Sequence, residues 1–192
     1  MDKIDWCLWK KGGLEIIEPN SNVSEAYVKK AESSLRSMRV VTEEEWVISM
    51  AYYAMYLAVY ALMIKIGVKC EMHSCSIEFV KVFLGKYFNE EEVAFLKKSL
   101  QARIDKQYYT DREVSDEQYQ AMTKRAQEYL IKAKSILMQI SEKEINDIRN
   151  RVMIRKTNRG KKDLEKPFKN AKNSRPVQRI SGEEIKKERE KQ

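Results

Sequence analysis

The residues best suited to chemistry lie at the end of a predicted helix, where residues 103–109 read R-I-D-K-Q-Y-Y. An arginine can stabilise the negative charge of a phosphoryl group, and a tyrosine can donate a proton or position a ribose hydroxyl. In an unbroken helix Tyr108 lies about 140° around the axis from Arg103. We therefore expect the two to converge only if the helix ends near residue 107. The alternative is a solvated helix end whose aromatic side chains close the bundle. Asp105 and Tyr109 complete the candidate set.

A second cluster surrounds His73, the one histidine of the sequence. Cys70 and Cys75 flank it, and Cys7 could complete a zinc site of three cysteines and one histidine. The spacing C-x2-H-x-C is not that of a usual ligand hairpin, so we expect buried thiols beside a helix-capping histidine, and no metal. An odd number of cysteines in a chain of this size favours reduced thiols and a cytoplasmic location. No glycine-rich phosphate loop occurs, and no cofactor is expected.

The charge of the chain is concentrated near its C-terminal end. Residues 149–192 hold 16 Lys and Arg against 6 Asp and Glu, a balance of +10, whereas the remaining 21 basic and 23 acidic residues give −2. Residues 155–192 contain two prolines and few large apolar groups, which predicts a largely disordered tail. Such a tail serves solubility or holds an RNA backbone. The candidate nucleic-acid contacts in it are Arg155, Lys156, Arg159, Lys161 and Lys162.

One stretch, residues 46–64, carries no charge in a chain that is 34% charged. It is long enough for a membrane span, and it also suits the central helix of a bundle. Four tyrosines in this run argue against lipid because each hydroxyl needs a hydrogen-bond partner, and the neighbouring helices are amphipathic. We therefore expect a central helix and no membrane span. A stripe of small side chains lets another helix or a second subunit approach closely, and its members are Ala51, Ala54, Ala58 and Ala61.

Few glycines and prolines, with apolar residues at steps of three and four, predict an all-α fold. We expect an irregular lead-in over residues 1–20, a helical domain over 21–154 and a tail over 155–192. Capping residues at Thr42, Asn89 and Ser115 mark helix starts, and Gly67 is placed to end a helix. About five helices with short connections favour an antiparallel bundle. The predicted helices cover about 21–38, 42–67, 74–87, 90–107 and 115–150.

The order of several short segments resembles the HEPN family (higher eukaryotes and prokaryotes nucleotide-binding domain). These segments are AYVKKAESSL, AYYAMYLAVYALM followed by a glycine, MHSCSIEFV, RIDKQYY and YLIKAKSIL. The likeness covers roughly residues 20–140. It is similar in particular to stand-alone prokaryotic and archaeal members that accompany minimal nucleotidyltransferases. The resemblance implies a four-helix core, a homodimer and, in many members, a metal-independent RNA endonuclease that acts as a toxin or in defence.

The signature of that family is an arginine followed, after four to six residues, by a histidine. Arg103 matches the arginine, but Tyr108 or Tyr109 stands in place of the histidine, and Asp105 occupies the place of a polar residue that supports the arginine. His73 matches the histidine of a helix-start HS pair and is expected to be structural or to flank the site. Tyrosine is a weak general base at neutral pH, so whether the protein is an enzyme stays open. One hypothesis is an endoribonuclease with an Arg–Tyr site; the other is a non-catalytic dimer that binds a nucleotide or a nucleotidyltransferase.

Overall fold

The computed structural model describes residues 2–164, with side chains through residue 158. Residues Met1–Arg159 form one compact unit and Gly160–Gln192 form a second. Of the second unit, the structure describes the residues up to Leu164, the last residue of α7. The fold is all-α, as predicted, with seven helices and one two-stranded sheet in the described residues. In chain order the elements are α1 (Lys3–Trp9), β1 (Glu15–Ile16), α2 (Ser21–Met38), α3 (Glu44–Ile66), β2 (Val68–Lys69), α4 (His73–Phe83), α5 (Glu90–Tyr108), α6 (Asp116–Gln139) and α7 (Glu142–Leu164).

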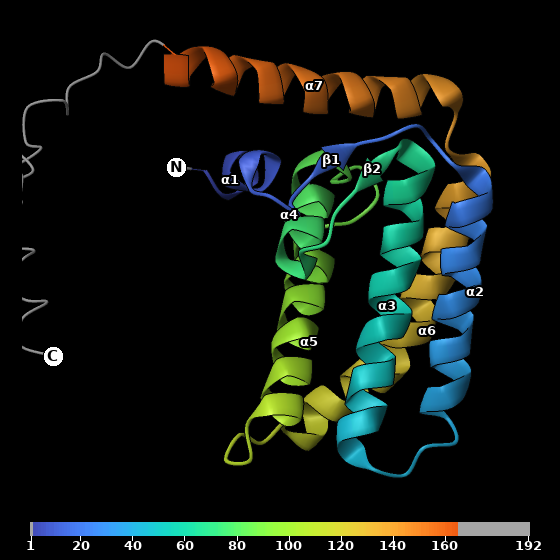
Figure 1. Ribbon diagram of the computed structural model, residues 1–192. Helices are drawn as coiled ribbons and strands as arrows, with labels where there is room; N and C mark the ends of the chain where they lie inside the picture. Colours follow the sequence, from blue (N-terminus) through green and yellow to red (C-terminus); the bar gives the residue numbers. More distant parts are fainter. Residues whose placement is uncertain (1, 165–192) are drawn as a thin grey trace, which may run out of the picture. The chain divides into compact units, whose positions relative to one another are not determined.

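Helix α3 is the centre of the bundle, and α2, α5 and α6 all pack against it (Figure 1). A helix that is apolar around its whole circumference belongs in a core. By length and composition α3 is able to cross a membrane, but 83% of its most apolar segment is buried inside the described structure. That burial fits the core helix of a soluble protein. The four alanines of the small-residue stripe are completely buried, so the stripe faces the core.

The helix starts follow the predicted caps at two of three places. Asn89 forms a full capping box, and the Ser115 side chain accepts a hydrogen bond from the third residue after it. The cap predicted at Thr42 is wrong, because α3 begins at Glu44 and its N-cap residue, Glu43, forms no side-chain bond. Glu44 and Glu45 in the first turn of α3 stabilise this helix start, because their negative charges interact favourably with the positive end of the helix dipole.

The last predicted helix, residues 115–150, is two helices in the structure. Helix α6 ends before residue 140, and Ser141 begins α7 by donating to the Glu144 carboxylate and accepting from the Glu144 backbone N–H. The apolar pattern continues across the break, which hides it from a periodicity argument; the buried residues there are Ile140, Ile145 and Ile148. Helix α7 runs to Leu164, so residues 155–164 of the predicted tail are helical, and residues 165–192 lie outside the described residues.

The N-terminal lead-in is ordered. It contains α1 and β1, and β1 pairs antiparallel with β2, Glu15 opposite Lys69. A disulfide joins Cys7 of α1 to Cys75 of α4, so the expectation of reduced thiols is wrong for this pair. Spacing gave no signal for the bond, because it closes a separation of 68 residues. A cross-link over so long a loop constrains the unfolded chain strongly. Cys70 is the buried free thiol, and burial raises its pKa.

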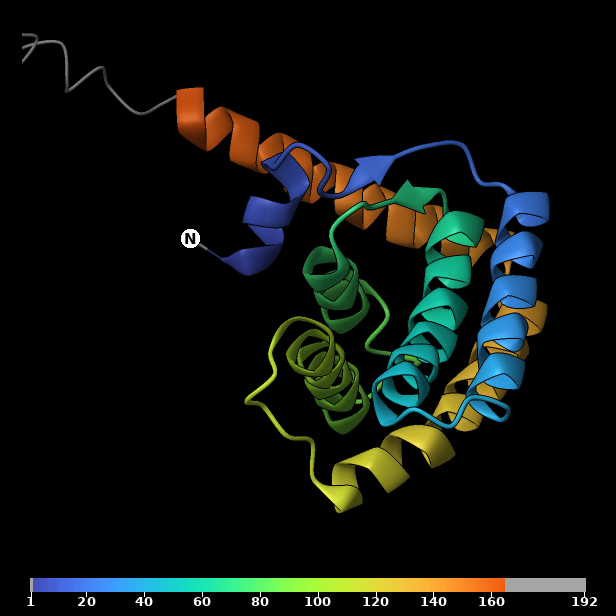
Figure 2. The ribbon, with the colours of Figure 1, turned by 60° about the horizontal axis from the view of Figure 1, so that its bottom comes forward.

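Helix α7 is held by one arginine against the end of α3. Nη1 of Arg149 donates to the carbonyls of Ile17, Ile66 and Gly67 at 2.7, 3.0 and 3.2 Å. Carbonyls at a helix C-terminus have no partner within the helix, and a cation there is favourable. Gly67 ends α3 as predicted, in the left-handed conformation with φ 84°. Figure 2 shows α7 passing beside β1 and β2, which Figure 1 also shows.

The end of α3 can be tested with two glycines. A Cβ at Gly67 would lie 1.9 Å from Nη1 of Arg149, whereas a Cβ at Gly85 meets only the Lys81 carbonyl, at 3.4 Å, and φ there is not positive. We expect Gly67→Ala to lower the free energy of unfolding by at least about 1–2 kcal/mol, the cost of a left-handed alanine. Gly85→Ala should stay within about 0.5 kcal/mol of wild type. Urea denaturation measures both, and equal stability of the two variants would contradict this role of Gly67.

Candidate functional site

Arg103 is half-buried between α5 and α3, where two tyrosines hold it. Its Nη2 donates to the Tyr53 hydroxyl at 2.9 Å, and its guanidinium carbon lies 5.4 Å from the Tyr53 ring centroid and 5.7 Å from that of Tyr108. Its Nε is buried and has no hydrogen-bond partner among the described residues. A buried donor without an acceptor costs free energy.

Arg103 of α5 and His73 of α4 line one pocket. The pocket has a volume of about 310 Å³ and lies between the start of α4 and the end of α5. His73 is the first residue of α4 and does not cap it, because the N-cap residue is Met72. The arrangement therefore joins the predicted arginine to the predicted flanking histidine across two helices. The lining residues are Met72, His73, Ser74, Leu100, Arg103 and Ile104.

The protonation of His73 follows from its neighbours. Its Nδ1 lies 2.6 Å from the Tyr52 hydroxyl, and its ring stacks on Tyr56 with centroids 4.0 Å apart. Burial, with a smaller contribution from the charge of Arg103, lowers its pKa, so the ring is neutral at pH 7. Burial raises the pKa of Tyr52, so that hydroxyl keeps its proton.

The direction of the hydrogen bond between these two residues decides what His73 offers. Nδ1 of His73 is the one acceptor that the described residues give to the Tyr52 hydroxyl. Tyr52 therefore donates, Nδ1 accepts, and the imidazole proton is on Nε2. Nε2 has no partner among the described residues, so it is free to donate. Arg103 and His73 together present N–H donors, which suits a phosphate group, and at pH 7 neither offers a free acceptor atom.

Asp105 does not support Arg103, contrary to the expectation from the sequence. Its carboxylate accepts from Arg112 at 2.6 Å and from Gln101 at 2.9 Å, and the hydrogen bond from Arg112 is the main cause of its lowered pKa. The Arg112 guanidinium also lies 3.6 Å from the ring centroid of Tyr109. Arg112 therefore draws both side chains into a separate cluster. It was missed because it lies in the polar link after α5, where periodicity carries no signal.

Tyr108 lies near Arg103 at the end of α5. It is the last residue of α5, and 67% of it is exposed. The helix thus ends within one residue of position 107, the condition for convergence, and the Tyr108 ring centroid lies 5.7 Å from the Arg103 guanidinium carbon. An ion pair between Lys106 and Glu44 at 2.9 Å ties this end of α5 to the start of α3, near the exposed Trp46. Exposed aromatic faces beside an arginine are suitable for stacking nucleobases.

The five basic residues predicted to contact nucleic acid differ in their surroundings. Arg155 is engaged within the protein, because it forms ion pairs with Asp2 and Asp5. Lys156 is partly exposed on α7. The backbone of α7 includes Arg159, Lys161 and Lys162, but the structure describes side chains only through residue 158.

The zinc alternative loses two ligands in the structure. Cys7 and Cys75 are bonded to each other, so neither is a thiolate. No group of three or more potential metal ligands occurs among the described residues.

Comparison with known families finds one match that covers the helices of the site. A model of the HEPN domain matches residues 24–136, which is more than half of the chain. The match runs from the first turn of α2 almost to the end of α6 and includes His73, Arg103 and Tyr108. A search of curated proteins finds no match.

The environment of His73 can be tested by NMR, because the sequence has no other histidine. We expect a pKa below the usual value of about 6.5, and Arg103→Gln should raise it partway, since burial remains. Arg112→Gln removes a neighbouring charge that does not face the imidazole and should leave the pKa unchanged.

The same shift predicts a pH dependence of stability. The unfolded state takes up a proton more readily than the folded state, so stability is retained above about pH 6.5 and lost as pH falls toward the folded pKa. A His73 that titrates at its ordinary value, or that ignores Arg103→Gln, would contradict the arrangement.

Proposed function

This chain belongs to the HEPN family, and from that premise we propose that it acts on RNA, with Arg103 and His73 holding a phosphodiester group. The family supports a function related to RNA or nucleotides in general. The observation that carries the proposal is that Arg103 and His73 line one pocket, and that each side chain has N–H groups to donate. Two converging donors match the oxygens of a phosphate.

The activity that we propose first is metal-independent endonucleolytic cleavage, of the toxin or defence type. In such a reaction the ribose 2′ oxygen gives its proton to solvent and attacks phosphorus, the bond from phosphorus to the 5′ oxygen breaks, and the 5′ oxygen takes up a proton from water. Arg103 would stabilise the charge that develops on the phosphoryl oxygens. The Nε2–H of His73 would donate a hydrogen bond to the same group. Tyr108 contributes a stacking surface close to Arg103.

A second candidate is a non-catalytic dimer that binds a nucleotide or a nucleotidyltransferase partner. It is favoured by the donor character of the pocket, since neutral His73 with its proton on Nε2 offers no base to deprotonate a 2′ hydroxyl. HEPN domains commonly dimerise, and we propose a cytoplasmic homodimer for either candidate. The exposed aromatic residues at the end of α5 offer apolar surface for a second subunit or for bases.

An RNA assay in the presence of EDTA separates these candidates. Wild type should cleave an unstructured RNA, and Arg103→Ala should slow cleavage by about 10²–10³, the effect of removing one donor to a developing oxyanion. Arg125→Ala is the matched control, because Arg125 also lies over an aromatic ring, Phe95, and pairs with a glutamate of α5. It should behave as wild type.

Two other results have defined meanings in that assay. Binding without cleavage by wild type, weakened by Arg103→Ala, would identify the second candidate. RNA binding and cleavage that are both insensitive to Arg103→Ala would overturn the proposed site.

The segment beyond the described structure carries a separate proposal, that it holds the RNA backbone. Residues 165–192 contain nine Lys and Arg against five Asp and Glu. Because α7 extends to Leu164, the informative truncation ends there. The shortened chain should keep its helical circular dichroism, bind RNA more weakly and show a shallower salt dependence. An unchanged affinity and salt slope would exclude a contact by this segment.

A further inference from the structure

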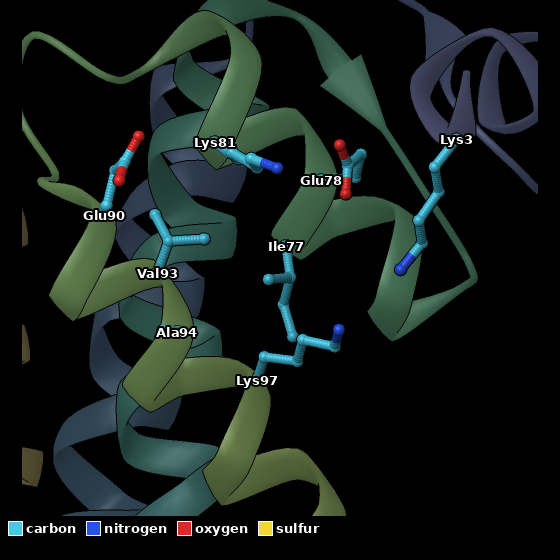
Figure 3. A pocket seen from close by; sticks show the side chains of 8 residues that line it. All are labelled: Lys3, Ile77, Glu78, Lys81, Glu90, Val93, Ala94 and Lys97. Atoms are coloured by element: carbon cyan, nitrogen blue, oxygen red, sulfur yellow. The ribbon is translucent and has the colours of Figure 1, made fainter.

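A second pocket lies beside the Arg103 site, between α1, α4 and α5 (Figure 3). It has a volume of about 310 Å³ and an apolar floor in which Ile77 and Val93 are 4% and 8% exposed. Its rim carries charged side chains from all three helices. The lining residues are Lys3, Ile77, Glu78, Lys81, Glu90, Val93, Ala94 and Lys97.

The rim charges are available to a ligand. Lys3, Lys81 and Lys97 are exposed, and none of them forms an ion pair or hydrogen bond with another described residue. Glu78 and Glu90 share the rim, which leaves a balance of one positive charge. Figure 3 shows Lys3 extending from α1 toward α4, Glu78 lying between Lys81 and Lys3, and the Glu90 carboxylate pointing away from Lys97. Three lysines from three helices thus surround the apolar floor, with one carboxylate among them.

This pocket and the Arg103 pocket occupy successive turns of the same two helices. On α4 the second pocket uses positions 77, 78 and 81, and the Arg103 pocket uses 73 and 74. On α5 they use 90, 93, 94 and 97, and then 100, 103 and 104. Steps of three and four keep these positions on one helix face. Lys97 and Arg103 are separated by about 9 Å along the axis of α5. The two pockets thus lie one after the other along the interface between α4 and α5.

We propose that the lysine-rimmed pocket binds the sugar–phosphate backbone of a single-stranded RNA segment that flanks the phosphodiester at Arg103. The inference rests on the proposed function and names the form of its substrate. Lysines contact the phosphates as point charges, and the floor at Ile77 and Val93 accepts a base or a ribose face. Two pockets in line along one pair of helices suit successive nucleotides of one strand, whereas duplex RNA presents its backbone as a wide surface.

The test uses 2′-O-methylated oligonucleotides, which cannot be cleaved through the 2′ oxygen: a dinucleotide and an octanucleotide of the same base. The variant Lys3→Gln/Lys81→Gln/Lys97→Gln should bind the octanucleotide more weakly. The slope of log affinity against log salt should shrink by about 2, since each phosphate contact on a single strand contributes about 0.7. Its affinity for the dinucleotide, which reaches only the Arg103 pocket, should be unchanged. Fluorescence anisotropy measures binding, and thermal melting confirms the fold.

A matched triple variant controls for net charge. Lys29, Lys124 and Lys143 are exposed on α2, α6 and α7, and Lys29→Gln/Lys124→Gln/Lys143→Gln should bind both oligonucleotides as wild type does. The proposal is overturned if the lysine-pocket variant keeps its affinity and salt slope. It is also overturned if the control variant loses as much, or if a duplex binds as tightly as the single strand.

The failure of this proposal can be told apart from the failure of the proposed function. Arg103→Gln should weaken binding of both oligonucleotides. If Arg103→Gln has no effect while the lysine-pocket variant loses the octanucleotide, the phosphate site at Arg103 is refuted and the lysine-rimmed pocket stands as an RNA contact. If Arg103→Gln weakens both and the lysine-pocket variant matches wild type, the proposal for the lysine-rimmed pocket alone fails.

Discussion

The tyrosine hydroxyls of α3 need hydrogen-bond partners inside a core of apolar side chains, and neighbouring elements supply one for each. An unpaired buried hydroxyl costs about 1–3 kcal/mol, which is a large part of the stability of a domain. Satisfying these groups fixes the start of α4 and the side chain of Arg103 relative to α3. The uncharged central part of α3 thereby positions His73 and Arg103, the two side chains of the candidate site. The pairs are Tyr52 with His73, Tyr53 with Arg103, Tyr56 with Ser76, and Tyr60 with the backbone N–H of Cys70.

Elements outside the range that matches the HEPN domain hold the same face of the bundle. The disulfide from Cys7 anchors α1 two residues after His73, and Arg155 of α7 ties α1 down through Asp5. Arg149 seats α7 on the end of α3. These contacts limit the freedom of the start of α4, where precise placement of an imidazole matters. Helix α1 also brings Lys3 to the lysine-rimmed pocket, so α1 contributes a side chain to that pocket as well as contacts that hold α4.

The sequence was sufficient for several features that depend on local chemistry, although not for the cap at Thr42. Gly67 and Asn89 fulfil their roles because a left-handed helix end and a capping box each require particular residues at fixed offsets. The break at Ser141 was hidden because apolar spacing continues through it. In the candidate site the need of the tyrosine hydroxyls for partners was visible, but the identity of those partners was not. Arg103 meets Tyr53 across 50 positions, and no local pattern specifies such a pair. The hydrogen bond from Arg112 to Asp105 could not be predicted either, since side-chain conformations in a link depend on tertiary contacts.

The donor role of His73 depends on Tyr52 rather than on Arg103. A bound phosphate would favour the imidazolium form, because its negative charge opposes the effect of Arg103 on the pKa. Protonation at Nδ1, however, would place two donors on one hydrogen bond of 2.6 Å, and the Tyr52 hydroxyl would have to turn its proton toward a core without another described acceptor. That reorientation opposes protonation even when an anion is bound. The buried tyrosine thus keeps the imidazole neutral and its Nε2–H directed away from Tyr52, so the ring contributes hydrogen-bond donation rather than proton transfer.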